Sequence, residues 1–192
     1  MSVSGLVRLA RSRVCRLVEF GVGTVVIYRH TRIVDVPCEA RIEVAPTEAL
    51  GEALQMDSPA QVEMLRKRAS RGDIVYRACL GGRMMHRGCL QPGPGIARCE
   101  HRVAFPLRRG EAYIHSCRTH ADGRGRGMYP ATLSRMAQDW KARGSDVYVA
   151  TVESNLASMR GIEKAGYSMT RRVRSLVLFG IGVWQRELGV PG

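Results

Sequence analysis

One glycine-rich turn between a strand-like run and a helix-like run constrains this chain more than any other feature. The strand-like run covers 111–117, the turn reads Arg-Gly-Arg-Gly-Met-Tyr-Pro from residue 124, and the helix-like run covers 129–143. Glycine lets main-chain amides approach an anion closely, and a helix N-terminus adds partial positive charge. Arg124 and Arg126 add full charges with forked donors. The stretch therefore predicts a turn that binds phosphate.

The overall charge is compatible with such a turn but does not identify its ligand. The chain has 192 residues, 45% of them hydrophobic, which suits one compact domain with its own core. Its net charge is +13 and its pI about 10.3. A surface of this kind attracts phosphate-bearing cofactors, nucleic acid, anionic membranes or acidic carrier proteins.

Cysteine usage and hydropathy indicate the compartment. The six cysteines show no CxxC spacing, which favours a reduced protein with buried thiols over a disulfide framework. No apolar run reaches the length of about 18 residues that a spanning helix needs. The N-terminus lacks the apolar core and cleavage site of a signal peptide. We therefore expect a cytoplasmic protein, either free or peripheral at a membrane.

The first 22 residues form a basic N-terminal segment that is amphipathic from 6 to 18. On a helical wheel, leucine, valine and alanine side chains share one face and arginines share the other. The segment is either a helix that caps the domain's own core or a helix that lies on an anionic membrane surface.

The remaining pattern predicts alternating strands and helices in one domain. A helix should begin after Ser58, which caps it in a Ser-Pro-Ala-Gln start, and end near Ala69. A hairpin should turn at Gly81-Gly82, and the proline-rich stretch 91–95 should be a loop. A second helix should run from an Asn155 cap to Ala165. Strands are expected at 23–28, 32–36, 73–80, 83–90, 102–107, 111–117 and 146–152, with one or two more in 167–184.

Two sequence blocks carry a resemblance to a known family. The first, Arg/Gln-x-x-Gly-x-Gly/Ala between a strand and a helix, reads Arg124-Gly125-Arg126-Gly127-Met128-Tyr129. The second, Asn-x-x-Ser/Ala followed by a helix and Ala-Gly-Phe/Tyr, reads Asn155-Leu156-Ala157-Ser158 through Ala165-Gly166-Tyr167. In this order and at this separation, the two blocks make segment 111–167 resemble the cofactor half of the GNAT superfamily of N-acetyltransferases.

The resemblance implies a fold and an activity. It is best over 73–184 and implies a single acyl-CoA N-acyltransferase domain over 1–192. The implied fold is α/β (α+β). It has a central mixed, mostly antiparallel twisted sheet of about six or seven strands, splayed between the fourth and fifth and flanked by helices. The implied reaction is transfer of an acetyl group from acetyl-CoA, or of another acyl group from its acyl-CoA, to a primary amine by direct attack on the thioester.

The same resemblance implies which residues bind the cofactor. Main-chain amides of residues 124 to 129 (Arg124, Gly125, Arg126, Gly127, Met128 and Tyr129) should hold the pyrophosphate. The strand backbone at Cys117, Arg118 and Thr119 should pair with the pantetheine arm as an added strand would. Asn155 should orient the pantetheine end or cap the adjoining helix. Tyr129 stands where the family has a small residue, so the approach of the helix to the cofactor must differ.

His115 is the candidate general base. Side chains of Glu111, Tyr113, His115 and Cys117 should alternate to one face of their strand, and His115 lies two residues before the pantetheine-binding backbone. Histidine gains and loses a proton near neutral pH, which suits proton abstraction from an amine. Glu111 is a second candidate, and the alternative for His115 is a hydrogen-bonded histidine in the slot wall.

The usual general acid of the family is missing. Many members carry tyrosine seven residues after the asparagine, and this position is Ile162 here. Tyr167, Tyr129 or water could protonate the leaving thiolate instead. The substitution also keeps open a CoA-binding protein without activity.

Other interpretations are weaker. His86, Cys89, Cys99 and His101 could together bind zinc, but their spacing matches no common zinc motif, so no metal is expected. Aromatic residues make up only 6% of the chain, which disfavours a nucleic-acid module, although a basic membrane-surface module stays open. The expected partner is a small-molecule or peptide amine, and an acidic carrier protein or an anionic membrane could deliver the substrate. Oligomeric state is not indicated.

Overall fold

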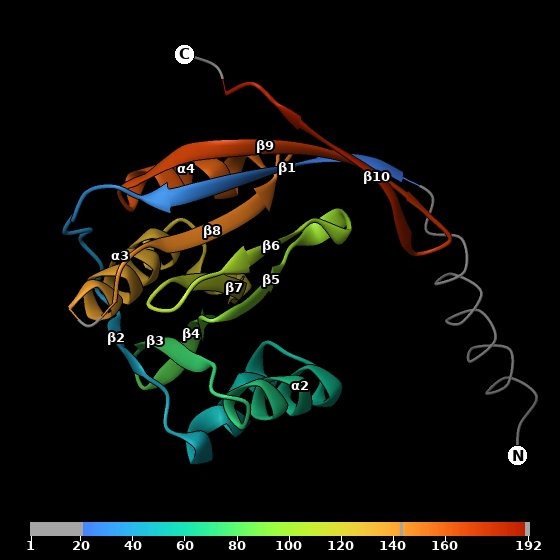
Figure 1. Ribbon diagram of the computed structural model, residues 1–192. Helices are drawn as coiled ribbons and strands as arrows, with labels where there is room; N and C mark the ends of the chain where they lie inside the picture. Colours follow the sequence, from blue (N-terminus) through green and yellow to red (C-terminus); the bar gives the residue numbers. More distant parts are fainter. Residues whose placement is uncertain (1–20, 143, 191–192) are drawn as a thin grey trace, which may run out of the picture.

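The computed structural model describes residues 21–142 and 144–190, and it shows one large mixed sheet with helices and a small ribbon against its faces (Figure 1). The sheet order is β10-β9-β1-β8-β7-β4-β3-β2, and β5 and β6 pair separately. The strands are β1 (Gly21–His30), β2 (Arg41–Val44), β3 (Ile74–Leu80), β4 (Arg83–Pro92), β5 (Gly95–Arg98), β6 (Ala104–Leu107), β7 (Ala112–Thr119), β8 (Val147–Val152), β9 (Tyr167–Leu178) and β10 (Ile181–Leu188). The helices are α2 (Pro59–Ala69), α3 (Met128–Lys141) and α4 (Leu156–Lys164), with 3-10 turns η1 (Thr47–Gln55), η2 (Glu100–Arg102) and η3 (Ala121–Gly123).

The predicted fold class is confirmed, with a larger sheet than expected. Among the described residues the main sheet has eight strands rather than six or seven, and only β7 and β8 pair in parallel. Counted from β2, that parallel pair joins the fourth and fifth strands. The short edge strand β2 and the turn η1 were not indicated by any residue pattern.

The first strand lies in the interior of the sheet. β1 pairs antiparallel with β8 on one side and with β9 on the other. Its continuous apolar run from Val25 to Tyr28 is fully buried, because it is covered on both faces. The sequence predicts this strand but not its place beside β8.

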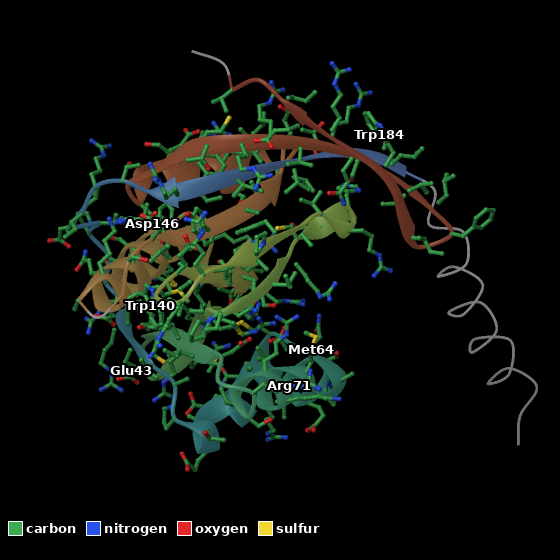
Figure 2. The ribbon with its side chains drawn as sticks, viewed as in Figure 1. Glu43, Met64, Arg71, Trp140, Asp146 and Trp184 are labelled. Atoms are coloured by element: carbon green, nitrogen blue, oxygen red, sulfur yellow. The ribbon has the colours of Figure 1, made fainter. Side chains whose placement is uncertain are left out.

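Two layers enclose the sheet. Leu133 and Met136 of α3 and Ile162 of α4 cover one face, where they pack on Val26 and Ile114. On the other face, α2 and η1 cover β3 and β4, while the β5–β6 ribbon covers β7, β1 and β9. Trp140, labelled in Figure 2, ties the end of α3 to the start of β7 by donating from Nε1 to the Gly110 carbonyl oxygen at 2.8 Å.

Two sequence predictions are wrong and one is incomplete. Residues 32–36 form no strand, because the Val34 carbonyl accepts from the Ser134 hydroxyl and the Gln138 amide instead of from a ladder. The stretch 91–95 is not all loop: β4 continues through Pro92 and β5 begins at Gly95. The strand expected at 102–107 begins at Ala104, and its partner β5 was not foreseen.

The local signals at helix and hairpin ends are confirmed. Ser58 and Gln61 form a reciprocal capping box at the start of α2. Gly81 and Gly82 both have positive φ in the β3–β4 hairpin. The Asn155 side chain accepts from the Ser158 amide at the start of α4. The basic segment 6–18 lies outside the described residues, and none of the described helices is long and apolar enough to cross a membrane.

Gly166, which ends α4, allows a matched test of the fold. Its φ is +88° and an added Cβ would lie 2.1 Å from the Arg32 carbonyl oxygen, whereas Gly72 has φ +99° and open space. We expect Gly72→Ala to cost only backbone strain, of about 1–3 kcal/mol. Gly166→Ala should cost about 1–3 kcal/mol more, because the chain at Arg32 must move. Urea unfolding of both variants measures the difference, and equal losses would contradict the close approach.

Candidate active site

The parallel strands β7 and β8 separate after a short paired stretch. They pair at Ala112–Val147, Tyr113–Tyr148 and Ile114–Val149, and no further. Both strands then continue, with β7 held by β4 and β8 held by β1. A cavity of about 1250 Å³ opens where they diverge, and its walls include the turn before α3 and the first turns of α3 and α4. This is the predicted splay.

The glycine-rich turn presents a row of free main-chain amides. The amides of residues 125 to 129 donate to no acceptor within the described part of the chain. Gly125 and Gly127 have φ of +75° and +73°, and α3 begins directly after Gly127. Amides in such a turn, at a helix N-terminus, form an anion-binding nest. The Arg124 amide is not part of it, contrary to prediction, because it donates to the Ala121 carbonyl oxygen.

The predicted site residues gather around this cavity with one exception. Its lining includes His115, Cys117, Arg118, Thr119, Arg124, Gly125, Gly127, Met128, Tyr129 and Asn155. Arg126 is exposed beside the turn and does not line it. Neither Arg124 nor Arg126 has an ion-pair partner among the described residues, so both charges are available to an anion.

A bulge in β7 changes which way its side chains point. Arg87 pairs with Arg118 and Cys89 with His115, so Gly88 alone faces both Ser116 and Cys117. Ser116 has φ +53°. The expected alternation therefore fails: His115 stacks on Tyr113, but Cys117 packs with the core cluster that contains Ile114, on the other face.

The His115 imidazole is enclosed by polar groups. Its Nε2 lies 3.1 Å from Asp73 Oδ2, and its Nδ1 lies 3.0 Å from the Ser116 hydroxyl. Arg68 Nη1 is also close to Nδ1, at 2.5 Å. Because a guanidinium only donates, Nδ1 is placed to accept from Arg68, and Nε2 is placed to donate to Asp73. Glu111, the second candidate base, accepts from the Arg108 amide, outside the cavity.

A buried ion pair lies beneath the bulge. Arg87 and Asp57 have side chains that are 4% and 0% exposed, and Arg87 binds Asp57 through Nε and Nη2. The Nη1 of Arg87 donates to the Ser116 carbonyl oxygen, and Arg118 approaches Asp57 from the cavity side at 3.3 Å. Asp57, in the turn before α2, is thus connected through Arg87 to Ser116, the β7 residue with positive φ.

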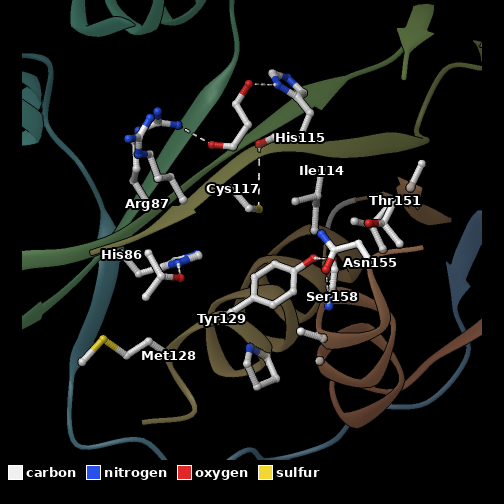
Figure 3. A pocket seen from close by; sticks show the side chains of 18 of the residues that line it. His86, Arg87, Ile114, His115, Cys117, Met128, Tyr129, Thr151, Asn155 and Ser158 are labelled. Carbon is white, nitrogen blue, oxygen red and sulfur yellow. Dashed lines mark hydrogen bonds between the residues drawn. The ribbon is translucent and has the colours of Figure 1, made fainter. Parts of the chain in front are cut away.

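The Tyr129 side chain, at the start of α3, packs against α4. Its hydroxyl is 3.0 Å from the Ser158 hydroxyl, and Figure 3 shows it pointing toward Asn155 and Ser158 on α4. A Cβ at Gly161 would meet the Tyr129 ring at 2.8 Å, so Gly161 makes room for the ring. Burial, and next the neighbouring Cys117 thiol, raise the pKa of Tyr129 above the usual range, so the phenol stays protonated.

Tyr167, the other tyrosine considered as a proton donor, lies away from the cavity. Ile162, which α4 carries at the position of the usual tyrosine, is fully buried in the core. Tyr167 is buried too, and its hydroxyl donates to the Leu133 carbonyl oxygen at 3.2 Å. Among the tyrosines proposed from sequence, only Tyr129 lines the cavity.

The histidines and cysteines considered for zinc have other contacts. His86 Nδ1 bonds the Thr119 hydroxyl at 2.7 Å, and the Cys99 sulfur accepts from the Tyr113 hydroxyl at 3.3 Å. No cluster of three or more His, Cys, Asp or Glu side chains in the described ranges could hold a metal ion.

Sequence reasoning missed the polar groups around His115. Arg68 comes from α2, Asp73 from the turn before β3, and Asp57 and Arg87 from the η1–α2 turn and β4. All are ordinary charged residues in the sequence, and no spacing rule joins them. A serine inside a strand pattern gave no sign of the bulge at Ser116.

Comparison with solved structures identifies the architecture. A GNAT-family acetyltransferase from Colwellia psychrerythraea matches with a TM-score of 0.62 and 15% identity, over 88% of this chain and 60% of that chain. A GNAT-family protein from Novosphingobium aromaticivorans matches with a TM-score of 0.58 and 17% identity, over 80% of this chain and 63% of that chain. The chain has a GNAT-like fold. No family model and no curated protein matches the sequence.

The GNAT-like architecture confirms the resemblance seen in the sequence at the level of fold. The chain spans 60–63% of the length of these two solved structures. Within that architecture, the separated β7 and β8 and the turn before α3 form the site described above.

His86 makes the stability of the GNAT-like domain depend on pH. Burial, and next the Arg87 guanidinium, lower the pKa of His86 to about 3. Below about pH 6.5 the unfolded chain therefore binds a proton that the folded chain does not, and stability falls as pH drops toward 3.

We expect His86→Gln to reduce the pH dependence of the unfolding free energy by about 1.4 kcal/mol per pH unit between roughly pH 4.5 and 5.5. Urea unfolding at several pH values gives the slope for both proteins. Parallel curves for the two would show that His86 is not held neutral.

Proposed function

We propose that this chain is an N-acetyltransferase that transfers the acetyl group of acetyl-CoA to a primary amine. The observation that carries the proposal is the combination of a free amide nest at residues 125–129 with a cavity between separated strands. A diphosphate suits the nest, and an extended thioester arm suits the slot. The GNAT-like fold of the chain supports the same assignment.

In this proposal the nest and both arginines of the turn bind the cofactor phosphates. Arg124 and Arg126 are exposed and without ion-pair partners in the described chain, so they add charge at little desolvation cost. On the side facing β8, the β7 backbone at Cys117, Arg118 and Thr119 has no paired strand, and the pantetheine amides can bond there. Asn155 caps α4 through its side-chain oxygen, which leaves the amide nitrogen for the pantetheine end.

The chemistry requires removal of a proton from the amine and delivery of one to the thiolate. His115 is the base, with Asp73 holding its Nε2–H and stabilising the charge after proton uptake. Tyr129 is the proton donor for the departing sulfur, in place of the tyrosine that Ile162 replaces. Its hydroxyl reaches the slot from α3 rather than from α4.

The acceptor enters from the side of α2. Gln61, Met64 and Arg68 of that helix and residues 98–100 line the cavity beyond His115. This end therefore selects the acceptor, a small-molecule or peptide amine. The net charge of +13 would attract an acidic carrier protein that delivers a longer acyl group, or an anionic membrane surface. In this proposal the protein is cytoplasmic.

Cofactor binding is tested by calorimetry with acetyl-CoA. Gly125 has φ +75° and no atom within 4 Å of an added Cβ, so Gly125→Asn places a side chain in the nest without a clash in the free protein. Asparagine tolerates this backbone conformation. We expect wild type to bind with a dissociation constant on the order of micromolar, and Gly125→Asn to bind at least about tenfold more weakly.

The matched control is Gly81→Asn in the β3–β4 hairpin, where φ is +57° and space is also open. Its affinity should equal that of wild type. Absence of acetyl-CoA binding, together with salt-sensitive binding to duplex DNA, would instead establish a basic nucleic-acid module. Binding without consumption of acetyl-CoA across amino sugars, polyamines, amino acids and peptides would indicate a CoA-binding protein that is not an enzyme.

His115→Ala separates catalysis from binding. Removal of a general base typically lowers turnover by about 10²–10⁴-fold. We expect such a loss of kcat with nearly unchanged affinity for acetyl-CoA, because the polar contacts of the His115 ring are with Arg68, Ser116 and Asp73 and not with the nest. Steady-state kinetics and calorimetry on the same preparation provide the two values. Equal kcat in mutant and wild type would show that His115 lines the slot without acting as the base.

A further inference from the structure

Ser116 occupies the point where the slot opens, in a conformation that serine seldom adopts. It is the second β7 residue beyond the last pair with β8, it lines the cavity, and its φ is +53°. A left-handed backbone costs a non-glycine residue of the order of 1–3 kcal/mol and persists only where surrounding groups hold it. Such strain gathers at functional sites, so the groups that hold Ser116 are informative.

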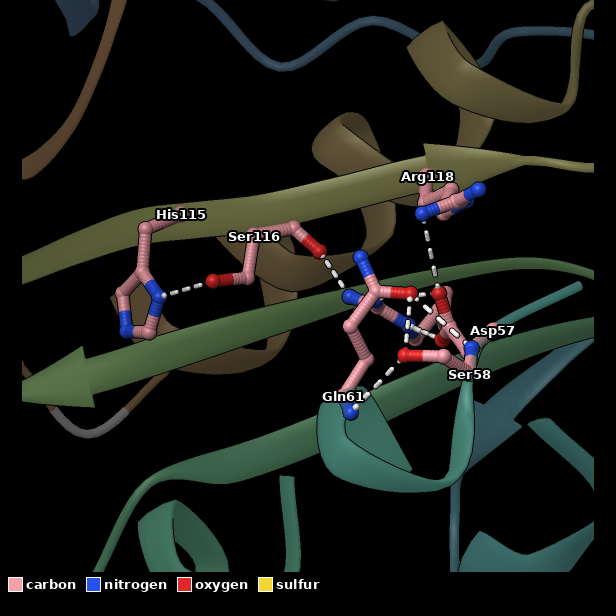
Figure 4. Close-up of polar contacts among 7 residues, drawn as sticks. Asp57, Ser58, Gln61, His115, Ser116 and Arg118 are labelled. Carbon is pink, nitrogen blue, oxygen red and sulfur yellow. Dashed lines mark hydrogen bonds and ion pairs between the residues drawn. The ribbon is translucent and has the colours of Figure 1, made fainter. Parts of the chain in front are cut away.

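The buried Arg87–Asp57 pair holds the main chain of Ser116. Nη1 of Arg87 donates to the Ser116 carbonyl oxygen, and the Arg87 guanidinium is in turn bound to Asp57. Figure 4 shows the Ser116 hydroxyl beside His115 and the Ser116 carbonyl oxygen turned toward the side where Asp57 lies. Both charged side chains are almost fully buried, and removing one partner of such a pair leaves an uncompensated charge. The bulge therefore has a fixed main chain at Ser116, which sets the direction in which the side chain leaves the strand.

That direction is toward His115. The Ser116 hydroxyl lies 3.0 Å from Nδ1, and Nε2 of the same ring lies 3.1 Å from Asp73 Oδ2. Hydroxyl, imidazole and carboxylate thus form a continuous chain. The His115 side chain is only 9% exposed and both ring nitrogens are engaged by protein groups, so the ring has no nitrogen free to meet an acceptor directly. The hydroxyl of Ser116, on the cavity wall, can both accept and donate.

We propose that Ser116 is a catalytic residue that passes the proton of the acceptor amine to His115. The acceptor ammonium gives a proton to Ser116 Oγ as the hydroxyl proton moves to His115 Nδ1. The amine nitrogen keeps its electron pair for attack on the thioester carbon, serine ends as a hydroxyl, and histidine ends as an imidazolium beside Asp73. Arg68 donates to the same Nδ1 in the free protein, so this step requires that Arg68 release the nitrogen.

This inference rests on the proposed acetyltransferase function, and Ser116→Gly tests it. Glycine adopts φ of +53° freely, so the variant removes the hydroxyl while retaining the bulge. With an alkylamine acceptor that is protonated at neutral pH, we expect kcat/KM for the amine to fall at least about tenfold, within the range for loss of a proton-transfer group. Acetyl-CoA affinity, measured by calorimetry, should not change.

A second acceptor distinguishes a proton relay from a structural role. Hydroxylamine is unprotonated at neutral pH and needs no initial deprotonation, so Ser116→Gly and wild type should acetylate it at similar rates. Ser116→Ala, which lacks the hydroxyl but retains a Cβ, should behave like Ser116→Gly with both acceptors. An equal loss with both acceptors would overturn the relay, because a distorted slot slows every acceptor.

Two further outcomes would overturn the inference in different ways. Full activity of Ser116→Gly with the alkylamine would remove serine from the mechanism while leaving the acetyltransferase function intact. An added acetyl group in the intact mass of wild type incubated with acetyl-CoA, absent from Ser116→Ala, would show that the serine attacks the thioester itself. If wild type neither binds nor consumes acetyl-CoA, the proposed function fails, and the relay fails with it.

Discussion

The site depends on the point at which β7 stops pairing with β8. Parallel strands share hydrogen bonds along their whole length unless other partners hold them apart. Here β4 holds β7 through Thr119, and β1 holds β8 through Val152. Because each strand has a neighbour on its outer side, the two can diverge after Ile114 without leaving the sheet. The inner edges then face a cavity instead of each other, and their polar groups become available to a ligand.

The bulge at Ser116 decides which side chains of β7 face this opening. An added residue in β7 reverses the side-chain alternation, so His115 and Cys117 point to opposite faces. The buried Asp57–Arg87 pair stabilises that bulge from below, and it links the turn before α2 to β7. Helix α2 in turn supplies Arg68, which contacts the same histidine. Helix α2 and the turn before it are therefore connected to β7 by a few charged side chains.

Two departures from the sequence pattern of the family that this chain resembles are explained by contacts across the fold. Tyr129 stands where a small residue is usual, and Gly161 on α4 leaves room for its ring. The ring brings a hydroxyl to Ser158, one helical turn from the position where Ile162 has none. A missing hydroxyl on α4 and an unexpected ring on α3 are thus parts of one arrangement.

The sequence by itself determined the features that depend on neighbours along the chain. The capped start of α2, the Gly81-Gly82 hairpin, the Asn155 cap and the glycine turn before α3 all follow from local backbone preferences, and all are present. Only the tertiary structure decided the rest. The position of β1 between β8 and β9, the bulge at Ser116 and the contacts of His115 with Asp73 and Arg68 join residues far apart in sequence. Such pairings are set by burial and charge across the sheet, and no local pattern of residues encodes them.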